Sequence, residues 1–254
     1  MADELPDIPS IAAADNPWGV DVLDVRPVTL HMRSSSKDPT MASNALSYGG
    51  EDGRSLADQH PPGDRVVDAS LRFRVDQALA DGVLFKPEAM EDKWALFLIE
   101  GRILFVRSWL RRVWVTADVR VDGDEAVVGP IRGAFLQRDT GEPAELTVRI
   151  VDFLLRSHAL GRVYPAPLPQ GLEEDPKSAA MWCMNMFGRR AMATTEAVIP
   201  WRMSPRPLRT DSALHIAIAR GELPEVERWL ATGLPIDLRA GDGLTTLHWA
   251  SSRD

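Results

Sequence analysis

Cysteine is almost absent from this sequence, since Cys183 is the only one among 254 residues. A single cysteine cannot form an intrachain disulfide, which excludes the small secreted proteins that disulfides hold together and favours a reducing compartment. Because Cys183 lies among apolar residues at helical spacing, we expect a buried structural thiol and not a nucleophile.

Long hydrophobic runs are lacking as well. No apolar stretch approaches the roughly 18 residues that a membrane-spanning helix needs, and the first residues carry neither the basic region nor the apolar run of a secretory signal. We therefore expect a cytoplasmic protein with no membrane partner. The net charge of −8 argues against a dedicated nucleic-acid binder.

Motifs that carry known chemistries are also missing. The sequence contains no GxGxxG, P-loop, GxSxG, HExxH or CxxC pair. His31, His60 and His158 are far apart in the sequence, and acidic pairs such as Glu91-Asp92 are typical of loop charges. We therefore predict no cofactor, no metal and no catalytic residue, although a catalytic set assembled only by the fold stays open. Enzymatic activity is left undecided, with a preference against it.

Between residues 70 and 130 the residue pattern is typical of short antiparallel strands. Runs rich in Val, Ile, Phe and Trp are separated by gaps of turn length. Glu100-Gly101 and Asp122-Gly123 both suit hairpin turns. The pattern predicts strands over 70–75, 94–99, 103–109, 112–121 and 125–129, and an earlier strand within 20–30.

Helical patterns surround this region. Asp38-Pro39 and Asp175-Pro176 each place a capping side chain before a proline at the first helical position. Apolar residues recur at helical spacing over 144–161, and Gly161 ends that pattern. We expect an α+β domain over residues 16–200, an antiparallel β-meander packed by helices. A loosely ordered N-terminus (1–15) precedes it, and a Pro-rich linker (201–209) follows.

The end of the sequence repeats one pattern at an offset of 33 residues. Leu214-His215-Ile216-Ala217 returns as Leu247-His248-Trp249-Ala250. This repeat resembles the ankyrin repeat, in which two antiparallel helices stack side by side on further copies. The matching positions are Leu214, His215, Ala217, Gly221, Gly233, Thr245, Leu247, His248 and Ala250.

The ankyrin resemblance implies that residues 210–254 hold one complete and one partial repeat, the start of an α-helical array that we expect to continue past residue 254. The alternative is that the N-terminal domain caps one side of the repeat and the partial repeat caps the other. His215 and His248 invite a metal interpretation, but the resemblance implies a structural role, and no cysteine or further histidine lies nearby to complete a zinc site. An ankyrin array implies a concave surface for a protein partner.

One hairpin is rich in arginine and tryptophan. If Glu100-Gly101 is a two-residue turn, Trp94 lies opposite Arg107 on the next strand, and Trp114 lies beside Arg107 if Leu110-Arg111 is the next turn. Arginine matches phosphate geometry and indoles stack on bases, so this face is a candidate anion or nucleotide site. The alternative is that tryptophans build the core while arginines pair or snorkel. The candidate residues are Lys93, Trp94, Arg107, Ser108, Trp109, Arg111, Arg112 and Trp114.

The same hairpin resembles an uncharacterised bacterial domain with a K-W…G-x-[IL]-x-F-x-R-S-W motif. Lys93, Trp94, Gly101, Arg107 and Ser108-Trp109 match it. The resemblance implies an α+β fold and no settled activity.

The first functional hypothesis is an adaptor that binds a protein partner through ankyrin repeats fused to the α+β domain. The alternative is an enzyme or sensor whose α+β domain binds a phosphorylated small molecule or nucleotide at the arginine- and tryptophan-rich face.

Overall fold

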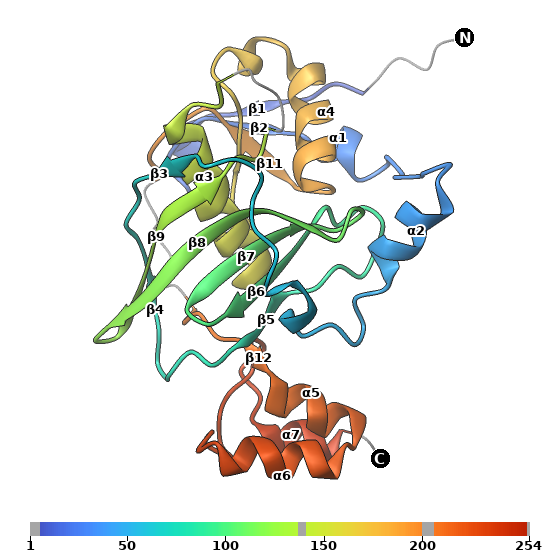
Figure 1. Ribbon diagram of the computed structural model, residues 1–254. Coiled ribbons are helices and arrows are strands. Elements are labelled where there is room, and N and C mark those ends of the chain that lie inside the picture. Colours follow the sequence, from blue (N-terminus) through green and yellow to red (C-terminus); the bar gives the residue numbers. More distant parts are fainter. Residues whose placement is uncertain (1–5, 137–140, 200–205, 253–254) are drawn as a thin grey trace.

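An antiparallel β-meander forms the centre of the computed structural model, which describes residues 6–136, 141–199 and 206–252 (Figure 1). The alternating apolar runs predicted between 70 and 130 form most of it. Side by side, the strands of this large sheet are β12 (Asp211–Ser212), β5 (Gly82–Phe85), β6 (Trp94–Ile99), β7 (Arg102–Arg107), β8 (Arg112–Asp122), β9 (Glu125–Gly133) and β3 (Val66–Val67), and β4 (Leu71–Arg74) also pairs with β9.

The β6–β7 turn has the predicted geometry. Glu100 and Gly101 both adopt positive φ, 49° and 71°. A two-residue hairpin turn requires this conformation when its twist matches the right-handed twist of the strands. Trp94 therefore lies opposite Arg107, as predicted. The β7–β8 turn is longer than predicted, because Arg107 pairs with Arg112. Trp114 nevertheless lies beside Arg107, and it is the extra residue of a bulge in β8, since Phe105 pairs with Val115 and Val106 with Val113.

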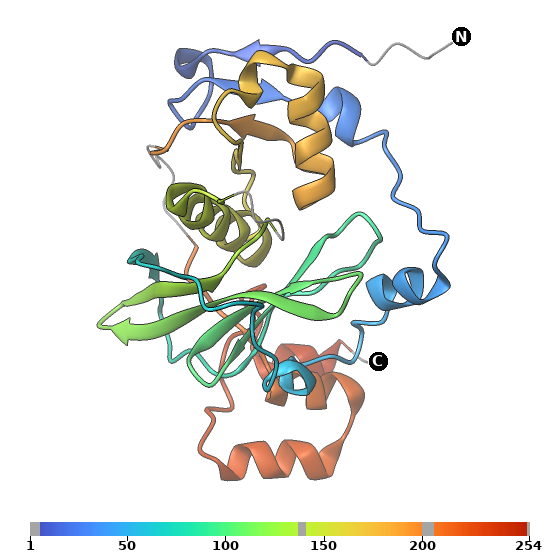
Figure 2. The same cartoon turned by 45° about the horizontal axis from the view of Figure 1, so that its top comes forward.

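One face of the large sheet is covered by two helices and a small second sheet (Figures 1 and 2). The helices are α3 (Ala144–Leu154), which continues as the π-helical turn η3 (Leu155–Ala159), and α4 (Pro176–Phe187). Their apolar faces meet the sheet in the main core, so the predicted α+β arrangement of meander and helices is present. The small sheet has the order β1 (Ser10–Ile11), β2 (Val22–Asp24), β11 (Met192–Thr194) and β10 (Ala166–Pro167).

The opposite face of the large sheet carries a second, smaller core. Residues 47–59, which we call the strap, follow α2 (Pro39–Leu46), contain the short helix η2 (Arg54–Leu56), and place Tyr48 and Leu56 against Phe97 and Leu104. The C-terminal helices α5 (Ala213–Arg220), α6 (Leu223–Ala231) and α7 (Thr246–Ser251) lie below the same face (Figure 1).

Several predicted boundaries need correction. The strand predicted within 20–30 ends at Asp24, and Pro27 lies inside the short helix α1 (Arg26–Thr29). The helix predicted from Asp175 begins there, and it ends at Phe187, because Gly188 adopts a φ of 79°. The remaining short helices are η1 (Ala13–Asp15) and η4 (Leu172–Glu174).

The predicted ankyrin array is wrong. In the described part of the C-terminal segment, three short helices follow β12, and no stacked helical array is present; the fold is dominated by the antiparallel sheet. The two repeated histidines begin helices, and the first also reaches a distant segment, because His215 Nε2 lies 3.0 Å from the Leu238 carbonyl oxygen. His215 and His248 each accept a hydrogen bond from the N-cap residue three positions earlier, Ser212 or Thr245, and so begin a helix. The copies also differ in burial, because Leu214 is buried whereas Leu247 is exposed.

The other repeat residues lie within the C-terminal helices or directly after them. Ala217 and Ala250 lie within α5 and α7, Gly221 ends α5 with a φ of 70°, and Gly233 follows α6 with a φ of 88°. Residues 201–205 of the predicted linker and residues 1–5 of the predicted loosely ordered N-terminus lie outside the described residues. Directly after them, Leu208 is buried and its N–H donates to the Arg74 carbonyl over 2.7 Å.

Candidate functional site

Trp94, Arg107 and Trp114 come together as predicted, at one end of β6, β7 and β8. The Arg107 guanidinium carbon lies 5.1 Å from the centre of the Trp94 ring and 5.6 Å from that of Trp114. Its Nη2 and Nη1 donate to the carbonyl oxygens of Asn185 (2.7 Å) and Met186 (3.2 Å) at the end of α4. Burial lowers the pKa of Arg107 to about 10. The side chain therefore ties the negative end of the α4 dipole to the sheet.

Lys93, Ser108 and Trp109 form a second group beside the first. The Lys93 ammonium lies 4.4 Å from the centre of the Trp109 ring and donates to the Met90 carbonyl over 3.0 Å. Trp109 Nε1 donates to the same carbonyl (2.8 Å), and Ser108 Oγ donates to that of Asp92 (2.6 Å). Burial lowers the pKa of Lys93 to about 8. These contacts fasten the loop before β6 to the end of β7.

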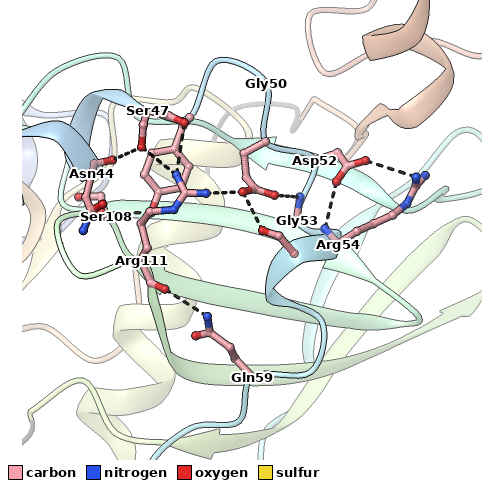
Figure 3. Close-up of polar contacts among 12 residues, drawn as sticks. Asn44, Ser47, Gly50, Asp52, Gly53, Arg54, Gln59, Ser108 and Arg111 are labelled. Carbon is pink, nitrogen blue, oxygen red and sulfur yellow. Dashed lines mark hydrogen bonds and ion pairs between the residues drawn. The ribbon is translucent and has the colours of Figure 1, made fainter. Parts of the chain in front are cut away.

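Arg111 holds the strap against the sheet (Figure 3). It occupies the β7–β8 turn with a φ of 47°, forms an ion pair with Glu51, and donates through Nη1 to the Ser47 hydroxyl over 3.0 Å. Its guanidinium stacks on the Tyr48 ring at 4.5 Å. These contacts fix Arg111 in a left-handed backbone conformation, which costs a non-glycine residue energy.

The eight predicted ligand residues thus have separate surroundings. Arg107 and Trp109 donate to main-chain carbonyls, and Lys93 donates to a carbonyl and to the Ser34 hydroxyl. Arg112 is exposed at the start of β8. Anion binding at these residues stays a prediction, and the contacts favour a structural role for them.

The most exposed apolar side chains of the C-terminal segment surround one groove of about 530 Å³. Ile218 of α5, Val226 of α6 and Ala250 of α7 line it. At its edges the residues Leu223, Ile236 and Leu247 are 70%, 66% and 75% exposed. Solvent-exposed apolar side chains gathered in this way mark interaction sites, whereas scattered ones do not.

The strap connects the three C-terminal helices to the sheet from one side. The Arg220 guanidinium of α5 donates to the Gly50 carbonyl, and the Arg54 guanidinium lies 4.2 Å from the centre of the Trp229 ring of α6. Figure 3 shows Gly50 and Arg54 on the same strap that Arg111 holds to the β7–β8 turn. The helices that form the groove are therefore held to the strap, and through the strap to the large sheet.

Sequence reasoning missed this groove. Leu223 and Ile236 belong to no motif, and the ankyrin resemblance placed Leu247 in the same role as buried Leu214. The only available signal was an amphipathic pattern in residues 223–231, where Leu223, Val226 and Leu230 recur at helical spacing among charged residues.

Two further properties concern the described residues only. No helix among them is long and apolar enough to cross a membrane. Nor do they contain a group of three His, Cys, Asp or Glu side chains placed to hold a metal ion. Cys183 is a buried free thiol whose pKa is raised to about 12 by burial, as expected for a structural cysteine.

Comparison with known proteins lends no support to either resemblance. The ankyrin interpretation and the K-W…R-S-W interpretation of the hairpin are both corrected, since no protein-family model, no curated protein and no solved structure matches the chain.

Proposed function

We propose that this protein recognises a partner protein through the groove of its three C-terminal helices, and that the occupant is an amphipathic helix with basic flanks. The proposal rests mainly on one observation: Leu223, Ile236 and Leu247 border a single groove and are each at least 66% exposed. Fully burying side chains of this size contributes about 1.5–3 kcal/mol each.

The shape of the groove favours a helix as the occupant. Its walls come from two helices, α6 with Leu223 and Val226 and α7 with Leu247 and Ala250, and Ile218 of α5 lies between them. An amphipathic helix inserts apolar side chains at positions i, i+3, i+4 and i+7 into a groove of this kind. An extended peptide would leave its backbone groups facing apolar walls without partners.

Charge favours basic flanks on that helix. Residues 211–252 contain six acidic side chains and three arginines. Arg220 and Arg228 lie within ion-pair distance of Glu222 and Glu225, at 3.7 Å and closer, whereas Asp237 lines the groove and is exposed. Lysines or arginines beside the apolar face of the partner would complement this rim and speed association.

The test uses a fluorescein-labelled helical peptide of about 18 residues, with leucines on one face and lysines on the other, titrated with the full chain by fluorescence anisotropy. We expect saturable binding that weakens at least about tenfold in Leu223→Glu and Leu247→Glu. The matched control is Val163→Glu, which alters a 64% exposed apolar side chain elsewhere and should leave binding unchanged.

A peptide of the same composition without an apolar face separates helix recognition from simple charge attraction. Equal binding of both peptides, or equal loss of binding in Val163→Glu, contradicts the proposal. The groove could instead bind a second copy of this chain, which light scattering of the chain alone tests. Self-association that Leu247→Glu abolishes would assign the groove to a second copy and overturn the proposal of a partner helix.

A further inference from the structure

A second pocket, of about 450 Å³, lies where the C-terminal segment meets the edge of the large sheet. β12 covers only Gly82 and Val83 of β5, so the strand edge from Leu84 onward borders the pocket instead of another strand. The opposite walls carry Arg190, which precedes β11, and Asp242, which lies between α6 and α7. Parts of the chain that are distant in sequence thus share one cavity.

Arg190 is a cation short of hydrogen-bond acceptors. Its Nη2 donates to Nε2 of His158 over 3.1 Å, and the nearest Asp92 oxygen lies 3.7 Å away, beyond a normal hydrogen bond. Its Nε is buried with no hydrogen-bond partner among the described residues. Burial lowers the pKa of Arg190, as expected for a guanidinium whose charge is incompletely compensated. A ligand carboxylate would supply the missing negative charge.

The other walls carry an excess of carboxylates. Asp211 accepts from the Gly241 N–H over 2.9 Å and Asp242 accepts from the Leu244 N–H over 2.8 Å, in each case through Oδ1. Lys86, which also lines the pocket, donates to the Gly49 carbonyl of the strap over 3.2 Å. In total the ionisable groups at the pocket are four acids and two cations: Glu88, Asp92, Asp211, Asp242, Lys86 and Arg190.

We propose that this pocket binds a small zwitterion with an additional positive charge, which is the chemistry of a basic amino acid. The carboxylate of the ligand pairs with Arg190, its amino groups pair with Asp211 and Asp242, and its aliphatic part lies against Phe85. A phosphorylated ligand is disfavoured, because four carboxylates surround the two cations. The proposal is independent of helix recognition at the groove, since the two pockets share no lining residue.

The test titrates L-lysine and L-arginine into the full chain by isothermal calorimetry. Three comparison ligands define the recognition: cadaverine, which is lysine without its carboxylate, L-glutamate, which has the opposite charge balance, and inorganic phosphate. We expect saturable binding of the basic amino acids and at least about tenfold weaker binding of cadaverine, with weaker binding still of glutamate and phosphate.

Two variants and two controls locate the site. Asp242→Asn keeps the side-chain oxygen that accepts from Leu244 but removes the charge, and we expect lysine affinity to fall at least about fivefold. Arg190→Gln should weaken lysine and leave cadaverine unchanged. The controls are Arg189→Gln, a neighbour whose side chain pairs with Glu91, and Asp122→Asn on an exposed hairpin.

Several results would overturn the proposal. They are an absence of saturation by lysine or arginine at about 10 mM, preferential binding of phosphate or glutamate, equal affinity for cadaverine and lysine, or equal losses in a variant and its control. If Arg190→Gln fails to fold, judged by circular dichroism, Asp242→Asn against Asp122→Asn decides the question.

Discussion

Lowering the pH from 7.5 to 5.5 should destabilise this protein through His158, because that side chain is buried in its neutral form. Its Nδ1 lies 2.7 Å from Ser157 Oγ and its Nε2 lies 3.1 Å from Nη2 of Arg190. A guanidinium has no acceptor, so Nε2 must accept and cannot carry a proton. Burial, and then the charge of Arg190, hold the pKa of His158 well below its usual value of 6.5.

The size of the effect follows from proton linkage. In the unfolded chain histidine titrates near pH 6.5, whereas native His158 stays neutral well below that pH. The unfolded state therefore binds a proton that the native state does not, so the free energy of unfolding is undiminished above pH 6.5 and falls as the pH drops below it. The loss reaches about 1.3 kcal/mol between pH 7.5 and pH 5.5.

Urea unfolding at pH 7.5, 6.5 and 5.5 measures this loss. Burial also lowers the pKa of His215, which adds a loss of the same sign, so the contribution of His158 is read as a difference between proteins. We expect His158→Gln to lose about 1.3 kcal/mol less than the native sequence over this range. His31→Gln, at an exposed position, should follow the native sequence. Parallel losses in the native protein and His158→Gln would refute the assignment of a neutral, buried imidazole.

Three further substitutions test the backbone and the arginine contacts. Glu100→Asn should stabilise by about 0.5–1 kcal/mol in thermal unfolding, because Glu100 has a φ of 49° in a turn that favours asparagine; an unchanged or lower melting temperature contradicts this. Gly53→Ala should cost about 2–4 kcal/mol in urea unfolding, because its Cβ would lie 2.7 Å from Phe97, whereas Gly63→Ala, also at positive φ but in open space, should cost about 1 kcal/mol; equal costs would rule out the steric explanation. Arg107→Met removes the donor to the Asn185 carbonyl and one of the two donors to the Met186 carbonyl, which Trp94 Nε1 also reaches, and should cost about 1–3 kcal/mol, against less than about 0.5 kcal/mol for exposed Arg112→Met; equal effects would argue against the anchoring role of Arg107.

The meander was predictable because its signals are local. Alternating apolar residues define β6, β7 and β8, and Glu100-Gly101 sets the register that places Trp94 opposite Arg107. The helix starts at Asp38 and Asp175 were predictable for the same reason, since each carboxylate caps its own first turn.

The short strands and both pockets were not predictable in this way. β12 has two residues and β11 has three, too few for an alternating pattern. The charged pocket joins Phe85, Arg190 and Asp242, whose proximity depends on the whole fold. The repeat misled because His215 and His248 both satisfy N-cap groups, and His215 also lies 3.0 Å from the Leu238 carbonyl oxygen, whereas the described C-terminal segment holds only three short helices.

The two-residue strand β12 has a practical consequence for dividing the chain. A fragment that stops at the predicted linker would lose Asp211 and Ser212, and Gly82 and Val83 would then present unpaired peptide groups to other molecules. Such a fragment would tend to self-associate, and any binding measured with it would reflect the unpaired edge of β5. Experiments on the α+β part alone therefore need a chain that retains these two residues and the first C-terminal helix.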